Sequence, residues 1–147
     1  MPVAEHDHGP LNVYVARVRS HQTDLNAAMY HGAYLDLFDD ARIEAFRRMG
    51  YTYERMLAGN WGVFIRSVHC EFHAPAFMDD LVSVTVCISR LTTATMTARY
   101  ECRRGSELLV VGENTYVFVD GNRKPIRVPR DLREVIEQHS DLLMPSM

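Results

Sequence analysis

The spacing of apolar residues changes along the chain from a helical period to a period of two, and this change predicts the elements. Leu11 to Ser20 is rich in β-branched and apolar residues, which favours a first strand. A long helix is expected from about Gly32 to Met49. Its apolar positions suit one helix face: Tyr34, Leu35, Phe38, Ala41, Ala45, Phe46 and Met49. Gly50 is a suitable residue to end it, and a short second helix is expected between Tyr51 and Gly59.

From residue 63 onward apolar and polar positions alternate, which predicts four strands. In the first of them, up to residue 73, the alternation assigns Val63 and Ile65 to the same face as Ser67, His69, Glu71 and His73. Three more strands are expected at about 82–89, 95–103 and 108–119. A short terminal helix at about 131–139 and a tail complete the chain.

Successive strands with one apolar face imply an antiparallel meander whose apolar face must be covered. Only the helix at about 32–49 is long enough to cover it. The pattern therefore predicts an α+β fold, a five-stranded antiparallel sheet wrapped around one long central helix. With 147 residues the chain is most simply one domain, of which residues 1–10 are expected to be flexible. A free strand edge favours a homodimer, or a homotetramer by further packing.

Composition and charge narrow the class of protein. A net charge of -3 argues against a nucleic-acid binder, because phosphate contacts favour a strongly basic surface. No apolar run approaches membrane-spanning length. Cys70, Cys87 and Cys102 have no CxxC spacing and are odd in number, so buried free thiols in a reducing cytoplasm are the simplest interpretation. A cytoplasmic protein is therefore expected.

The candidate chemistry lies between the first strand and the long helix, where Asp24 is followed by His31 at the start of the helical pattern. Unpaired backbone N–H groups and the positive end of the helix dipole meet at a helix N-terminus. An acid beside such an anion site suits acyl-transfer chemistry. On this basis the backbone N–H groups of His31 and Gly32 are candidates for an oxyanion hole. The alternative for Asp24 is a helix cap or an Asx turn that only organises the loop.

Several short motifs resemble those of one known family. They are Thr23-Asp24, Tyr30-His31-x-x-Tyr34-Leu35, Phe38-Asp39-x-Ala41-Arg42, Pro75-Ala76-x-x-Asp79-Asp80-Leu81, and Phe118-Val119-Asp120 with Val128-Pro129. Between about Val13 and Pro129 the chain resembles the hotdog-fold acyl-CoA thioesterases of the 4-hydroxybenzoyl-CoA type. The resemblance implies hydrolysis of an acyl-CoA or acyl-carrier-protein thioester, with no cofactor and no metal.

The resemblance also implies roles for individual residues. Asp24 would act as general base or nucleophile on the thioester carbonyl, and the His31 ring would orient substrate or water or carry a proton. Tyr30, Tyr34 and Phe38 would line the acyl pocket or the core around it. Arg90, on the turn after a meander strand, would contact the CoA nucleotide. The site would lie at a dimer interface, with two active sites per dimer.

Two positions depart from the family pattern. Ala27 stands where the family usually has Gly, so Asn26 is expected to adopt the left-handed conformation instead. Phe77 stands where Arg or Lys is common after Pro-Ala. The missing charge leaves two interpretations: the CoA phosphates are held elsewhere, or the acyl carrier is not free CoA.

Two other functions remain possible when the sequence alone is considered. A hotdog enoyl-thioester hydratase carries Asp-x-Asn-Pro-x-His, of which Asp24-Leu25-Asn26 matches only the first half, with Met29 in place of the His. A non-catalytic acyl-thioester-binding module would need no Asp24. His69, Glu71 and His73 share a strand face and could suggest a metal site. Because no further well-placed ligand accompanies them, an exposed polar face is favoured over a metal site.

Overall fold

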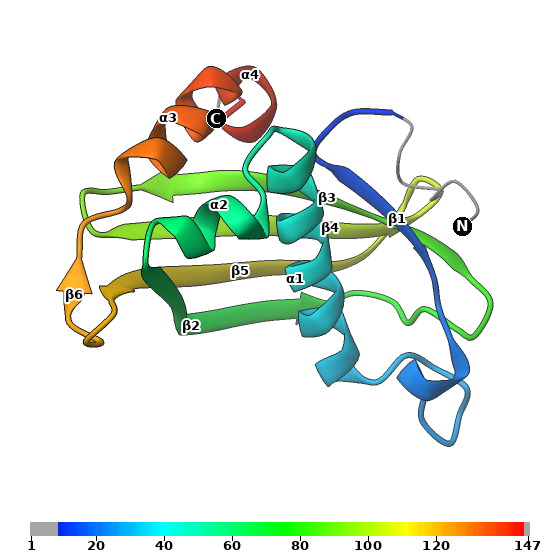
Figure 1. Ribbon diagram of the computed structural model, residues 1–147. Helices are drawn as coiled ribbons and strands as arrows, with labels where there is room; N and C mark the ends of the chain where they lie inside the picture. Colours follow the sequence, from blue (N-terminus) through cyan, green and yellow to red (C-terminus); the bar gives the residue numbers. More distant parts are fainter. Residues whose placement is uncertain (1–8, 146–147) are drawn as a thin grey trace.

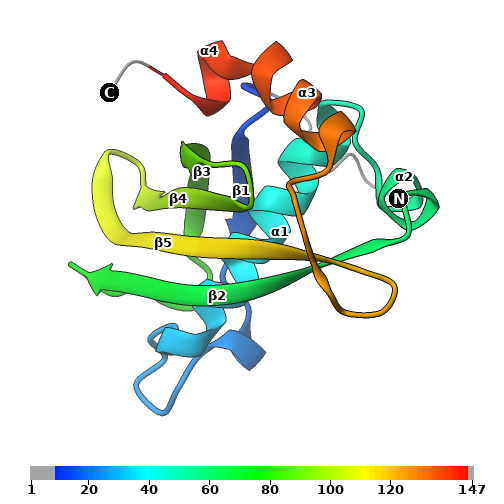
Figure 2. The same cartoon turned by 90° about the vertical axis from the view of Figure 1, so that its left-hand side faces the viewer.

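The computed structural model describes residues 9–145, which form one antiparallel sheet with five long strands in the order β1-β3-β4-β5-β2. The strands are Val13–Arg17 (β1), Trp61–Phe72 (β2), Leu81–Leu91 (β3), Thr95–Arg104 (β4) and Glu107–Asp120 (β5). A two-residue strand, Pro125–Ile126 (β6), pairs with β5. The expected five-stranded sheet is confirmed, and β1 and β2 are its outer strands (Figure 2).

The long helix α1 (His31–Arg48) lies across one face of the sheet, as Figure 1 shows. Its C-terminus is closed by Gly50, whose φ of 94° lets the Tyr51 N–H donate to the Phe46 carbonyl at 2.8 Å. The other helices are α2 (Tyr53–Ala58), α3 (Arg130–Gln138), α4 (Ser140–Leu143) and the 3-10 turn η2 (Ser20–Gln22). The pattern of apolar residues did not predict α4 or η2.

A bulge in β2 makes the assignment of its residues to the two sheet faces differ from the predicted one. The register with β5 shifts between Ile65 and Ser67, so that Ile65 lies opposite Tyr116 and Val68 lies opposite Asn114. Because a bulge adds one residue to one strand only, it reverses the alternation beyond it. Val63 and Ile65 therefore share the α1 side of the sheet with Val68, Cys70 and Phe72, and the prediction that grouped them with Ser67 and His69 is wrong.

The core between α1 and the sheet is centred on two stacked rings. Phe38 and Tyr100 are both fully buried, with ring centroids 4.7 Å apart and planes 7° from parallel. Gly112 makes room for this pair, because a Cβ there would lie 2.5 Å from the Phe38 ring. The sequence analysis assigned Phe38 either to the acyl pocket or to the core around it, and in the structure Phe38 lies in the core.

A buried hydrogen-bond network lies beside these rings. The hydroxyls of Tyr100 and Tyr116 are 2.7 Å apart, and Arg42 donates to the Tyr116 hydroxyl at 2.6 Å. The same guanidinium forms an ion pair with Asp39 at 2.7 Å. Phe38, Asp39 and Arg42 belong to one sequence motif, and in this structure that motif joins α1 to the sheet. Such networks stabilise a unique packing when their members are paired.

Cys70, Cys87 and Cys102 are free thiols, as expected, but only Cys102 is buried and the other two are half-buried. Across residues 9–145, no helix has the length and apolar character needed to cross a membrane.

Candidate active site

Asp24 lies in a tight loop that precedes α1, and its carboxylate organises that loop. Asp24 Oδ1 accepts a hydrogen bond from the Asn26 N–H at 2.8 Å, which is an Asx turn. The Asp24 N–H donates to the Ala28 carbonyl at 2.8 Å and the Ala27 N–H donates to the Asp24 carbonyl at 3.0 Å. The side chain is exposed, and within the described residues Asp24 Oδ2 accepts no hydrogen bond. One carboxylate oxygen is thus structural and the other faces solvent.

The left-handed residue of this loop is Ala27, with φ 60°, and not Asn26. The prediction for Asn26 is therefore wrong. The Asx turn explains the difference, since Asn26 uses its N–H to close the turn and the reversal of the chain falls on the next residue. Ala27 keeps the backbone shape that the family's Gly would adopt without strain.

A second loop, before β3, holds the Asp24 loop in place. The Met29 N–H donates to the Ala76 carbonyl at 2.8 Å, and the Met78 N–H donates to the Ala27 carbonyl at 3.0 Å. From α1, the Tyr34 hydroxyl accepts the Ala76 N–H at 3.1 Å. The continuous stretch from the Asp24 loop to the first turn of α1 is therefore fixed against a loop that is far away in sequence.

The first turn of α1 presents two unpaired donors. The Ala33 N–H donates to the Tyr30 carbonyl at 3.0 Å, but within residues 9–145 no group accepts from the N–H of His31 or Gly32. These are among the N–H groups that every helix start leaves free, and they carry the positive end of its dipole. The Tyr30 ring lies over Gly32, since a Cβ there would be 2.9 Å from it.

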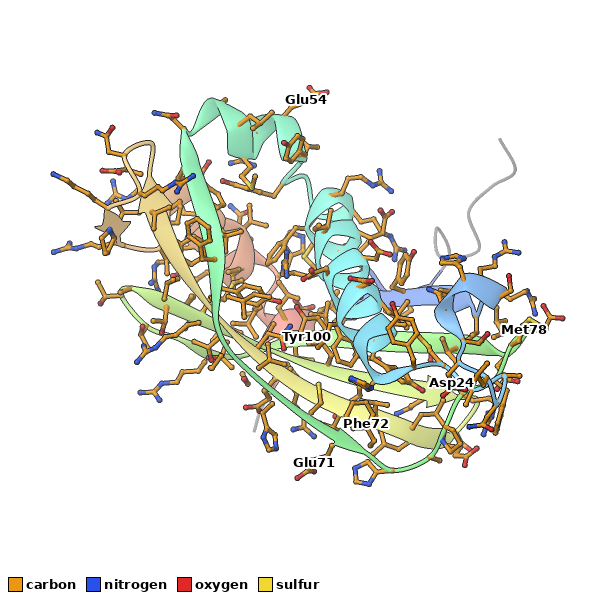
Figure 3. The ribbon with its side chains drawn as sticks, turned by 90° about the horizontal axis from the view of Figure 1, so that it is seen from below. Asp24, Glu54, Glu71, Phe72, Met78 and Tyr100 are labelled. Carbon is orange, nitrogen blue, oxygen red and sulfur yellow. The ribbon has the colours of Figure 1, made fainter. Side chains whose placement is uncertain are left out.

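A cavity of about 290 Å³ opens beside this turn. Its walls are Met29, His31, Tyr34, Phe72, His73, Ala74 and Pro75. Figure 3 shows that Asp24 and Phe72 lie near the same end of α1. Burial raises the pKa of Tyr34, so its hydroxyl stays neutral at physiological pH. The structure thus places two free N–H groups beside a cavity, and the loop that carries Asp24 leads into the same turn of α1.

The predicted site residues do not all meet here. His31 and Tyr34 line the 290 Å³ cavity, whereas Tyr30 is 40% exposed and packs edge-on to the His31 ring at 6.4 Å. Arg90 lies in another cleft, of about 620 Å³, which it shares with Arg66 and five hydroxyl side chains: Ser67, Thr92, Thr95, Thr97 and Thr115. Asp24 and Arg90 therefore belong to different surfaces of one chain.

The sequence analysis did not assign five of the cavity residues to the site: Met29, Phe72, His73, Ala74 and Pro75. Phe72 contacts Tyr34 edge-on, with ring centroids 5.7 Å apart, and is 52% exposed. The signal was present in the sequence: an aromatic residue and a His come directly before Ala74-Pro75, which ends β2. The place of Phe72 on the α1 side of the sheet depends on the bulge, which alternation alone could not reveal.

His69, Glu71 and His73 form only long, exposed ion pairs, with His nitrogens 3.7 and 4.0 Å from the Glu71 carboxylate. In the described part of the chain, no group of three or more His, Cys, Asp or Glu side chains is arranged to hold a metal ion.

Comparison with known proteins identifies the class. Residues 18–136 match the thioesterase-like superfamily. The acyl-CoA thioesterase YbgC of Haemophilus influenzae is 26% identical over 122 residues, which cover 82% of this chain and 90% of that protein. The crystal structure of a hypothetical protein from Aquifex aeolicus has a TM-score of 0.80 at 27% identity, covering 84% of this chain and 97% of the other.

A more distant structure, the DHNA-CoA thioesterase from Staphylococcus aureus, shares the fold, with a TM-score of 0.81 at 21% identity over 89% of this chain and 91% of that one. The chain belongs to the thioesterase-like superfamily. The fold and the reaction class expected from the sequence, a hotdog-fold thioester hydrolase, are confirmed. The family match favours thioester hydrolysis over the hydratase and binding-module alternatives.

Proposed function

We propose that this protein is an acyl-CoA thioesterase whose reaction takes place between the Asp24 loop and the first turn of α1. The observation that carries the proposal is the pair of unpaired N–H groups of His31 and Gly32 beside a cavity and a fixed acidic loop. The name of the YbgC relative supports acyl-CoA as the acyl carrier.

In this mechanism the thioester carbonyl oxygen lies against the N–H groups of His31 and Gly32. These donors stabilise the negative charge that develops when the carbonyl carbon becomes tetrahedral, and such a donor is typically worth about 3–4 kcal/mol. Asp24 either removes a proton from the attacking water or attacks the carbon itself. Collapse of the intermediate breaks the C–S bond, and the thiolate leaves and is protonated. If water was the nucleophile, the product is the free acid. If Asp24 was the nucleophile, the product is a mixed anhydride on Asp24, which water then hydrolyses to release the free acid and restore the carboxylate.

The remaining roles follow the chemistry of each side chain. The His31 ring and the aromatic rings of Tyr30 and Tyr34 orient the acyl group at the cavity mouth. Arg90 and Arg66 contact phosphates of the carrier, which the hydroxyl-rich cleft between them supports. An acyl-carrier protein is the alternative carrier, since Phe77 leaves the family's usual basic position uncharged.

The proposal includes a homodimer, or a tetramer of two such dimers, in the cytoplasm. Three free thiols support a reducing compartment. A long outer strand supports association. Native mass spectrometry measures the assembly directly.

The central experiment compares thiol release by wild type, Asp24→Asn and Asp36→Asn on short aliphatic, long aliphatic and aromatic acyl-CoAs. Asn at position 24 keeps an oxygen that can accept the Asn26 N–H, so the loop remains folded while the charge is lost. We expect a loss of about 10²–10⁴-fold. Asp36, an exposed acid on α1, is the matched control and should retain full activity. Equal rates for Asp24→Asn and wild type would exclude this mechanism.

A further inference from the structure

One short segment concentrates positive charge in a chain whose net charge is -3. Residues 121–130 lead from β5 through β6 to the first residue of α3 and contain no Asp or Glu. The basic segment consists of its four cations: Arg123, Lys124, Arg127 and Arg130. All four are exposed, and within residues 9–145 none of their side chains forms an ion pair or a hydrogen bond. Like charges this close repel one another, so an anionic partner would stabilise them.

The acids nearest to the basic segment in sequence do not supply this partner. Asp120 Oδ1 accepts two backbone N–H groups of its own turn, at 2.8 and 3.0 Å. Asp131 accepts the Tyr51 hydroxyl at 3.2 Å and lies 3.6 Å from the Arg55 guanidinium. Glu134 is exposed on α3 and, in the part of the chain that the structure describes, forms no ion pair. The four cations therefore remain uncompensated within the chain.

Two of these cations stand where the backbone disfavours them. Arg123 has a φ of 61°, a left-handed conformation that glycine adopts far more readily than arginine. Arg130 is the first residue of α3, where the positive end of the helix dipole disfavours a cation. An anion bound to the basic segment would remove the electrostatic part of this cost. Unfavourable placements of this kind point to a function rather than to stability.

The basic segment is extended and fixed, and its cations do not converge on one point. β6 pairs with β5, and the Val128 N–H donates to the Thr93 carbonyl at 2.9 Å. Val128 is buried, whereas Arg127 before it is exposed. Lys124 and Arg130 are six residues apart, up to roughly 20 Å in an extended chain. An array of this width suits a surface that carries many phosphates better than it suits one small anion.

The basic segment lies at the opposite end of the sheet from the Asp24 loop, as Figure 1 shows. The 14 residues of β5 span roughly 45 Å between these two ends. Arg104, just before β5, donates to Asp80 at 2.6 Å in the loop that holds the Asp24 segment. Beyond its other end β5 leads into the basic segment. A partner bound there leaves the α1 N-terminus of the same chain open.

We propose that the basic segment docks this protein on an anionic lipid surface, where the phosphates of the headgroups neutralise its four cations. Groups of four or more Lys and Arg side chains at a protein surface are attracted to such headgroups. The argument depends on charge complementarity, because the cations have no counterions in the described chain and form an extended, rigid array. The inference goes beyond the thioesterase activity, since it gives the protein a place of attachment.

Co-sedimentation with vesicles tests the docking. The wild type should bind vesicles of phosphatidylcholine with about one third phosphatidylglycerol at low salt, and should dissociate in about 1 M NaCl, which screens the charges. Arg127→Gln/Arg130→Gln should weaken binding at least about 10-fold, since each cation contributes roughly fivefold. Arg19→Gln/Arg47→Gln is the matched control, because it removes two exposed cations elsewhere and changes the net charge equally. It should bind as the wild type does.

Other occupants of the basic segment are outcomes of the same test. Arg127→Lys/Arg130→Lys keeps the charge and should still bind vesicles. A loss in this variant would point to a specific site for one phosphate, because Lys lacks the planar guanidinium, and would overturn the docking. Thiol release from acyl-CoA without vesicles should be equal in Arg127→Gln/Arg130→Gln and wild type, and a raised KM would assign the segment to the carrier instead. Equal binding of the wild type to pure phosphatidylcholine, or no binding to either vesicle, would also overturn the inference.

Discussion

The hydroxyl of Tyr34, in the first turn of α1, accepts a hydrogen bond from the backbone N–H of Ala76 at 3.1 Å. Both residues are buried, and Ala76 also accepts the Met29 N–H from the segment that leads into α1. A tyrosine in the family motif therefore ties the start of the helix to the loop before β3. Because of this hydrogen bond Tyr34 is a structural residue. Because it also lines the cavity, it is a candidate contact for substrate as well.

Tyr34→Phe should lower the free energy of unfolding by about 1–3 kcal/mol, because it leaves the buried Ala76 N–H without an acceptor. Urea unfolding followed by circular dichroism measures the change. Tyr53→Phe is the matched control, since Tyr53 is 66% exposed, and it should have little effect. If the two variants are equally stable, the hydroxyl of Tyr34 does not hold the loop.

Gly112→Ala tests the close approach of α1 to the sheet. The added Cβ would lie 2.5 Å from the Phe38 ring, which is stacked on Tyr100 and cannot move without opening the core. We expect a loss of about 1–3 kcal/mol in unfolding free energy, the usual cost of overpacking.

The matched control for that variant is Gly62→Ala, another strand glycine. An added Cβ there would lie 3.6 Å from the Val119 side chain, an ordinary contact. Gly62→Ala should be neutral or slightly stabilising in the same thermal or urea unfolding measurement. Equal losses at the two positions would show that strand propensity, and not the Phe38 ring, determines the effect.

The fold could be predicted from the alternation of apolar residues in strands and their spacing in the helix, because both patterns are local in sequence. The apolar face of Ala41, Ala45 and Phe46 specifies the helix, and strict alternation in β3 specifies a strand buried on one side. Element ends were predicted to within a few residues. The bulge in β2 was not predicted, because one inserted residue between Ile65 and Ser67 leaves the composition of the strand unchanged.

The candidate site was only partly predictable for a related reason. Asp24 and His31 were found from local spacing and motif, and the Asx turn at Asp24 was already the alternative interpretation. The wall formed by Phe72 and His73 depends on pairing over long sequence distances. The separation of Arg90 from Asp24 likewise needed the sheet order, which places β3 and the Asp24 loop in space.

Ala27→Gly should stabilise the protein. Ala27 has a φ of 60°, a conformation that costs an L-residue roughly 1–2 kcal/mol and glycine almost nothing, while glycine's greater freedom in the unfolded chain cancels part of the gain. We expect a net increase of up to about 1 kcal/mol in unfolding free energy. Ala28→Gly, next in sequence and at a negative φ, should do the opposite. A destabilised Ala27→Gly variant would show that the turn carries no strain.

The last prediction concerns Asp80, whose carboxylate holds the loop that contacts the Asp24 segment. It accepts the Phe77 N–H at 2.8 Å and an Arg104 N–H at 2.6 Å. The Phe77 hydrogen bond and the Arg104 guanidinium hold the pKa of Asp80 below its ordinary value of 3.8. Because the folded-state pKa is depressed, this stabilisation is fully present above pH 3.8 and is lost as the pH falls through the folded-state pKa.

Asp80→Asn should therefore be less stable than wild type at pH 7. The difference should shrink as the pH falls below 3.8, where the unfolded chain takes up a proton at Asp80, and should be lost once the pH is below the lower folded-state pKa. Thermal unfolding at a series of pH values measures both curves. Asp36→Asn is the control, since Asp36 is exposed on α1 and should show no loss at pH 7. A constant difference between Asp80→Asn and wild type from neutral to acid pH would mean that the Asp80 charge does not stabilise the loop.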